Sequence, residues 1–166
     1  MSKLVSRAYT GPADLNAMID LIKSLRNNGQ VVYPIAADLH EELADPDVQI
    51  TARLWETASQ RLVGFAYVNR YDNMVDVFQA QDFTPEIELE MINWVVAAVQ
   101  RRTHDKAEIH TLDASALESD SPRLAFLERH GFARQRGSSI LMARSLDQPT
   151  PDPRMPAGFT YSPYAS

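Results

Sequence analysis

The sequence has no cysteine in its 166 residues, and it is poor in glycine. Without cysteine there is no disulfide framework, no thiolate nucleophile and no thiolate metal site, which fits a protein of the reducing cytoplasm. Only six glycines occur, and none lies between Gly64 and Gly131. Glycine lets a backbone approach phosphate groups closely. The middle of the chain therefore contains no glycine-rich phosphate loop.

Positive charge and long apolar runs are also lacking. The net charge is −6, the pI is about 5.1, and no Lys/Arg cluster is larger than Arg101-Arg102. Proteins that bind nucleic acid need a basic face, so no nucleic-acid partner is expected. The apolar run from Val95 to Val99 is far too short to span a bilayer, and the first residues do not resemble a signal peptide. The sequence predicts a soluble, cytoplasmic protein with no membrane partner.

The residues that are present suit one domain followed by a tail. A chain of 166 residues with 45% hydrophobic residues can bury one core of ordinary size. Five of the ten prolines follow Leu146, a composition typical of a stiff, extended linker. We therefore expect a domain over residues 1–146 and a Pro-rich tail or interdomain linker over residues 147–166.

The spacing of apolar residues predicts a mixed order of strands and helices. In the longest predicted helix, Leu89, Ile92, Val95, Val96 and Val99 form the expected buried stripe. Asp45-Pro46-Asp47 is expected to interrupt the chain as a helix breaker. The fold class is α/β (α+β), a mixed, mostly antiparallel sheet with helices on both faces. The predicted strands are 4–9, 50–57, 62–71, 74–80, 109–113, 132–136 and 139–146, and the predicted helices are 11–27, 37–43, 84–99 and 121–130.

Two stretches resemble the GNAT family of N-acyltransferases. The run Pro122 to Phe132, which ends in Leu127-Glu128-Arg129-His130-Gly131-Phe132, is similar to the last helix and sixth strand of that family. Arg7-Ala8-Tyr9-Thr10 with Ala13-Asp14-Leu15 is similar to its first strand and helix. The resemblance covers about residues 4–146. It implies the GNAT fold, acetyl-CoA as cofactor and transfer of an acyl group to an amine.

The resemblance also implies where coenzyme would lie: in a splay between the fourth and fifth strands, with its pyrophosphate at the start of the long helix. The family loop there is usually Arg/Gln-x-x-Gly-x-Gly/Ala. In this chain Gln81 matches, but Thr84 and Glu86 occupy the glycine positions, and Pro85 removes a backbone N–H. The residues that could hold coenzyme, if it binds, are Val77, Phe78, Gln79, Gln81 and Thr84.

Three carboxylates follow that loop, on Glu86, Glu88 and Glu90. Carboxylates interact favourably with the N-terminal end of a helix, where a phosphate would otherwise be held. They would compete with the coenzyme phosphates. The alternative is that these carboxylates are solvent-exposed groups that stabilise the start of the helix through its dipole.

No residue qualifies as the catalytic acid of the family. Leu127 stands where the family usually has its acid tyrosine, and leucine cannot donate a proton. Tyr67, Tyr71, Tyr161 and Tyr164 are the possible substitutes, although such residues commonly serve packing. The histidines are widely spaced and lack the pairing of a metal helix, so no metal site is predicted. There is also no Gly-x-Ser-x-Gly motif of a hydrolase.

The tail carries a further resemblance. Met155-Pro156-Ala157-Gly158-Phe159-Thr160-Tyr161 is similar to the first-strand segment of a GNAT domain. This implies the N-terminal half of a tandem GNAT protein, with a second GNAT domain or a homodimer as partner. The alternative is an ordinary tail. The predicted function is a catalytically degenerate GNAT-like domain that packs or binds, and the alternative is an active acetyl-CoA-dependent N-acetyltransferase of a small amine.

Overall fold

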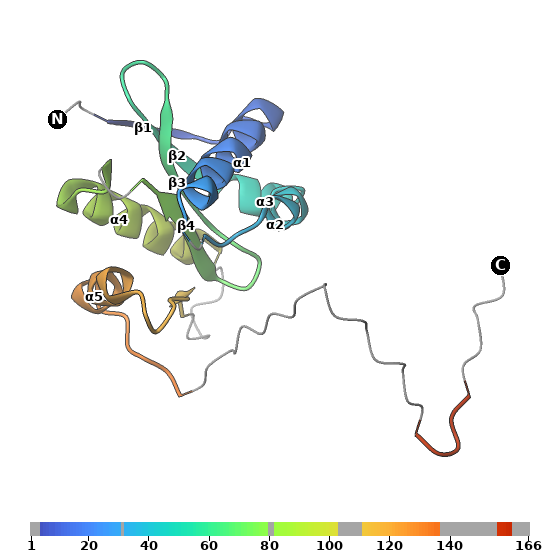
Figure 1. The fold of residues 1–166 in the computed structure, drawn as a ribbon. Helices are drawn as coiled ribbons and strands as arrows, with labels where there is room; N and C mark the ends of the chain where they lie inside the picture. Colours follow the sequence, from blue (N-terminus) through green and yellow to red (C-terminus); the bar gives the residue numbers. More distant parts are fainter. Residues whose placement is uncertain (1–3, 31, 80–81, 103–110, 137–155, 161–166) are drawn as a thin grey trace. The chain divides into compact units, whose positions relative to one another are not determined.

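The computed structural model describes residues 4–30, 32–79, 82–102, 111–136 and 156–160. The chain separates into two compact units, residues 1–133 and residues 134–166, and each is described by itself. All described helices and strands belong to the first unit (Figure 1). In chain order they are β1 (Val5–Ala8), α1 (Pro12–Asn27), α2 (Ala36–Glu42), α3 (Pro46–Gln49), β2 (Arg53–Glu56), β3 (Leu62–Val68), β4 (Asn73–Phe78), α4 (Pro85–Arg102), β5 (Asp113–Ala114) and α5 (Ser121–Arg129).

The five strands form one sheet in the order β1-β2-β3-β4-β5. Pairing is antiparallel from β1 to β4, and β5 joins β4 in parallel. All seven residues of β3 are buried, as expected for a central strand that is covered on both faces. The predicted fold class, a mixed and mostly antiparallel sheet with helices on both faces, is confirmed.

Two clusters of buried side chains cover the two faces of the sheet. One cluster joins α1 and α2 to residues such as Leu54 and Phe65. The other joins α4 and α5 to residues such as Trp55 and Val63. Figure 1 shows α1 and α4 on opposite sides of the strands. The sheet is therefore the middle of three layers.

Asp45-Pro46-Asp47 follows the end of α2, as a breaker should, but it also starts a short helix, α3. The Asp45 carboxylate accepts a hydrogen bond from the Asp47 N–H at 2.9 Å, and Pro46 takes the first helical position. Two strand predictions are wrong. The strand expected from residue 50 consequently begins at Arg53. In addition, residues 132–136 form no strand, and the expected partner at 139–146 lies outside the described residues.

The buried stripe of α4 also differs from the prediction. Leu89 and Val96 are 55% and 38% exposed. Leu89 follows the buried Ile87 by two residues, which places it about 200° around the helix. The buried residues of α4 are Ile87, Met91, Ile92, Val95, Ala98 and Val99.

The second unit has two described parts, residues 134–136 and 156–160. Pro156 and Phe159 close a turn in which the Phe159 N–H donates to the Pro156 carbonyl at 3.1 Å. Gly158 has a φ of 90°, a left-handed conformation that favours glycine. The predicted domain boundary at residue 146 stays a prediction.

Candidate functional site

The candidate site is the edge of β4 that β5 leaves unpaired. Only Asn73 and Met74 of β4 pair with β5, opposite Asp113 and Ala114. From Val75 to Phe78, β4 continues without a described strand on that side. We call residues 75–78 the β4 edge. It lies where the resemblance places the splay between the fourth and fifth strands.

The backbone of β4 presents the N–H groups of Asp76 and Phe78 to this edge. The Gln79 N–H donates to the Val63 carbonyl at 2.9 Å, so it points towards β3. In an antiparallel ladder, successive residues alternate in the side to which their N–H points. Val77 lies opposite Phe65, and its N–H therefore also points towards β3. The Phe78 N–H points the other way, towards the β4 edge.

An ion pair lies across the β4 edge. Arg123, in the first turn of α5, donates from both terminal nitrogens to the Asp76 carboxylate, at 2.8 Å each. Its Nε donates to the Ser115 carbonyl, directly after β5, at 2.7 Å. One guanidinium thus links β4 to the chain leaving β5, in the bidentate geometry that makes such bonds strong.

This pair is largely shielded from solvent. The Asp76 side chain is 5% exposed and that of Arg123 is 23% exposed. Burial by itself lowers the pKa of Arg123, but the charge of Asp76 and its hydrogen bonds outweigh that effect and raise it. The Asp120 carboxylate also accepts the Arg123 N–H at 3.1 Å and caps α5. The guanidinium is therefore charged and fixed in place.

Aromatic rings pack beside the end of β4. The Phe78 ring lies 5.1 Å from that of Trp55 and 4.6 Å from that of Phe83, and Phe83 lies 5.4 Å from Phe126. Phe78 also covers Gly64, where an added Cβ would come 2.0 Å from the ring. The side chains of Phe78 and Phe83, before and after the predicted pyrophosphate loop, are thus part of the packing.

The start of α4 uses its own groups as caps. The Thr84 hydroxyl donates to the Glu86 carboxylate at 2.7 Å, and the Thr84 carbonyl accepts the Glu88 N–H at 2.9 Å. The Thr84 hydroxyl and the N–H of Glu86 itself lower the pKa of that carboxyl. Glu86 is thus an anion at the helix N-terminus. Gln81 lies outside the described residues.

The other two glutamates face packing partners. Glu88 bonds to Arg129 at 3.0 Å and to the His130 ring at 3.2 Å. Glu90 accepts the indole N–H of Trp55 at 3.3 Å and the hydroxyl of Ser6. Of the three carboxylates predicted to compete with phosphate, only Glu86 has no described partner beyond its own loop and helix start.

Neither of the described substitute tyrosines replaces the missing acid at the β4 edge. Leu127 is buried on the α4 side of the sheet, whereas Tyr67 is buried on the α1 side. Tyr71 is 66% exposed in the β3–β4 turn, at the other end of β4 from Phe78 and roughly 20 Å along the strand. Tyr161 and Tyr164 lie outside the described residues.

The N-terminal motif has a structural role. Arg7 donates to both Asp14 oxygens, at 2.8 and 2.7 Å, and also reaches Glu56 at 2.6 Å. Thr10 donates its N–H and hydroxyl to the same Asp14 carboxylate. The Arg7 hydrogen bonds lead the effects that lower the pKa of Asp14 to about 2, against an opposing effect of burial. These contacts fasten the start of α1 to β1.

The sequence predictions did not include Asp76 or Arg123. The signal for Asp76 was a lone carboxylate inside the apolar segment Met74 to Phe78. Such a charge in a covered strand requires a partner. The partner could not be chosen from the sequence, since it lies 47 residues away.

No protein-family model and no curated protein matches the chain. Among solved structures, it is similar to a GCN5-related N-acetyltransferase from Sphaerobacter thermophilus, with a TM-score of 0.58 and 18% sequence identity. The chain has a GNAT-like fold. The match covers 78% of this chain and 43% of that chain, so this GNAT-like chain spans less than half the length of its neighbour. Fold similarity does not itself establish activity.

Metal binding and membrane insertion find no support within the described residues. No group of three or more His, Asp or Glu side chains there could hold a metal ion. None of the helices in this part of the chain has the length and apolar character needed to cross a membrane.

Proposed function

We propose that this GNAT-like domain does not catalyse acyl transfer and serves as a packing or binding domain. The observation that carries the proposal is the Arg123 guanidinium, which joins Asp76 on β4 to Ser115 beyond β5. A pantetheine arm between the two strands would have to displace this ion pair.

Displacement would be costly. Asp76 is 5% exposed, and removing the partner of a buried charge costs about 3–5 kcal/mol. Every 1.4 kcal/mol is a factor of about ten in affinity, so the cost is about two to three and a half orders of magnitude in coenzyme binding. A cofactor that binds to an open cleft pays no such cost.

The start of α4 supports the same conclusion. A diphosphate is bound best by a helix start whose N–H groups are free and whose surroundings are not negative. At this helix start, Pro85 has no N–H and Glu86 supplies a carboxylate. The diphosphate of acetyl-CoA would therefore meet like charge.

Thermal unfolding with and without about 1 mM acetyl-CoA tests the proposal. A ligand with a Kd of about 10 μM would stabilise the native state by about 2.7 kcal/mol, which is roughly 5–10 °C in Tm for a chain of this size. We expect no increase in Tm and no acetylation of a panel of amines. An increase of that size, or detectable transfer, would show that the cleft accepts coenzyme.

One observation favours the alternative of an active N-acetyltransferase. The Phe78 N–H points towards the β4 edge, where it could polarise a thioester carbonyl. In that case the backbone near Val77, Phe78 and Gln79, with Gln81 and Thr84, would hold acetyl-CoA. Acetyl-CoA would then raise the Tm in the same experiment, and a small amine would be acetylated.

We further propose that the packing partner is a second GNAT-like domain, as in a homodimer. Leu89 and Val96, seven residues apart on α4, expose apolar side chains on one helix face. The length of the Sphaerobacter protein, of which this chain spans 43%, is consistent with more than one such domain. Sedimentation at about 100 μM should show a dimer that Leu89→Ser dissociates. A monomeric wild-type chain would contradict this proposal.

A further inference from the structure

The outward side of α4 carries a regular stripe of exposed residues. Its members recur at steps of three and four residues, so they lie on one side of the helix, away from the buried residues that pack on the sheet. Steps of this kind place side chains along the seam between two paired helices. We call these residues the α4 stripe: Glu86, Leu89, Asn93, Val96 and Gln100.

The middle of the α4 stripe suits contact with another helix. Leu89 and Val96 are exposed, and they stand on either side of Asn93. Two large apolar side chains on one side of a helix gain free energy when they are covered. A single asparagine between apolar residues of a helix pair fixes the register of the two helices, at a cost in stability. The α4 stripe therefore has the pattern of a helix that pairs in one defined register.

The two ends of α4 carry opposite charges. Glu86, in the first turn, is exposed and has no ion pair among the described residues. Arg101, in the last turn, is exposed and stacks on the Trp94 ring at 5.0 Å, and it likewise forms no ion pair within the described ranges. An antiparallel copy of α4 would bring each Glu86 beside an Arg101, whereas a parallel copy would bring Glu86 beside Glu86. The charges therefore favour antiparallel pairing.

We propose that the homodimer forms through α4, with the two copies of the helix antiparallel and a twofold axis beside Asn93. This geometry requires the proposed homodimer, and it does not depend on the loss of acyl transfer. In a twofold interface, every contact between two residues occurs twice, once on each side of the axis. Leu89 lies four positions before Asn93 and Val96 three positions after it, so each Leu89 contacts Val96 of the other copy. Glu86 lies seven positions before Asn93 and Arg101 eight positions after it, so the same axis pairs them.

Such an interface is small. Stable protein interfaces bury about 800 Å² on each partner, and one helix with two large apolar side chains in contact buries less. At the axis, the two Asn93 side chains can bond to each other, because each amide has donors and an acceptor. We therefore expect a reversible dimer with a Kd of about 10–100 μM.

Cross-linking of single cysteine variants tests this geometry, and the chain has no cysteine of its own to interfere. Asn93→Cys, at about 100 μM with oxidised glutathione, should form a disulfide-linked dimer, because residues beside the axis approach within the roughly 4–7 Å between Cα atoms that a disulfide spans. Glu86→Cys and Gln100→Cys should each stay monomeric under denaturing conditions when oxidised alone, and should form a linked heterodimer when mixed. In a parallel pair each of these two variants would link to itself, and that result would overturn the proposal.

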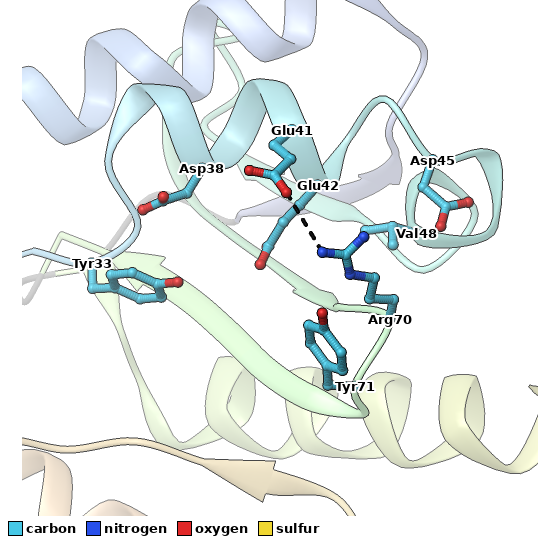
Figure 2. Close-up of a pocket in the computed structure, with 8 residues that line it drawn as sticks. All are labelled: Tyr33, Asp38, Glu41, Glu42, Asp45, Val48, Arg70 and Tyr71. Carbon is cyan, nitrogen blue, oxygen red and sulfur yellow. Dashed lines mark ion pairs between the residues drawn. The ribbon is translucent and has the colours of Figure 1, made fainter. Parts of the chain in front are cut away.

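The control is Glu41→Cys on α2. The Glu41 side chain is 74% exposed and pairs with Arg70 at 3.5 Å (Figure 2). Helix α2 packs on the face of the sheet opposite α4, since Leu39 belongs to the same cluster as α1. Glu41→Cys should therefore give at least about fivefold less linked dimer than Asn93→Cys. Equal cross-linking of the two variants would indicate random collision and would overturn the proposal.

Reversal of the terminal charges tests the direction of pairing in a second way. Arg101→Glu places like charges at both ends of the antiparallel pair, and it should raise the Kd about threefold to tenfold at low salt. The double variant Glu86→Arg with Arg101→Glu restores both contacts and should recover the wild-type Kd. A double variant that dimerises no better than Arg101→Glu would contradict antiparallel pairing.

Sedimentation separates a failure of this geometry from a failure of the homodimer itself. A wild-type dimer without cross-linking of Asn93→Cys would overturn pairing through α4 and leave the homodimer standing. A wild-type monomer at about 100 μM would overturn both. Neither result changes the outcome expected for acetyl-CoA, which is measured by thermal unfolding.

Discussion

At the scale of residues, two ion pairs hold neighbouring elements together, and the carboxylate of each is nearly buried. Arg123 and Asp76 join the strands at the β4 edge, and Arg7 and Asp14 fasten α1 to β1. In each pair the arginine approaches both carboxylate oxygens, and the carboxylate is less than a tenth exposed. Such pairs fix geometry, and they are costly to break from one side only.

Arg123→Leu should destabilise the protein by about 3 kcal/mol in urea unfolding, because Asp76 keeps a buried charge without its partner. The control is Arg134→Leu, an exposed arginine, which should stay within about 0.5 kcal/mol of wild type. Replacing both members, as Asp76→Asn with Arg123→Leu, should recover part of the loss. Wild-type stability in Arg123→Leu alone would show that the bridge is not a strong constraint.

Asp14 should make stability depend on acid. Its pKa is about 2 in the folded protein against an ordinary 3.8, so its contribution is present above about pH 4 and is lost as the pH falls towards 2. Partial solvent screening limits this contribution to about 1–2 kcal/mol. Between pH 5 and pH 2, the free energy of unfolding in urea should fall by about this amount more for the wild-type protein than for Asp14→Asn. Parallel losses in the two proteins would contradict the assignment.

At the scale of elements, the points where helices begin and end were easier to predict than the sides of the helices that are buried. The Pro12 start of α1 and the Pro85 start of α4 were predicted, since proline suits the first turn of a helix. The stop after α5 was also predicted: Gly131 adopts a φ of 84°, and the Phe132 N–H closes on the Leu127 carbonyl at 3.0 Å. These signals are local in the sequence.

Which side of a helix or strand is buried depends on the element that it packs against. Leu89 and Val96 fit a helical repeat as well as the truly buried residues do, so spacing alone could not reject them. The five strands lie in the sheet in the same order as in the chain, so this order could be predicted from the sequence. The ion pair of Asp76 and Arg123 could not be predicted, because a contact between β4 and α5 exists only after the sheet and helix have packed.

The pairing of β3 with β4 yields a prediction at this scale. Gly64→Ala should destabilise the protein by about 1–3 kcal/mol, because the new Cβ would come 2.0 Å from the Phe78 ring. The same substitution in a Phe78→Leu background should cost markedly less, since the ring is gone. Urea unfolding of the four proteins in this cycle measures the coupling. Equal costs in both backgrounds would mean that the ring moves aside freely.

At the scale of the whole molecule, the proposal that this GNAT-like fold does not transfer acyl groups rests on three features. An ion pair crosses the β4 edge, a carboxylate occupies the start of α4, and Leu127 replaces the acid. On the proposed function, each of these features would weaken catalysis, and together they would prevent acyl transfer.

The most direct test is the amide signal of Phe78 in a nitrogen-15 correlation spectrum, because that N–H faces the β4 edge. Acetyl-CoA at about 1 mM would nearly saturate a site with a Kd of about 10 μM. We predict that the Phe78 signal does not move over such a titration in the wild-type protein. A saturable shift of this signal, with matching shifts in residues 82–87, would show that coenzyme enters the cleft and would contradict the account.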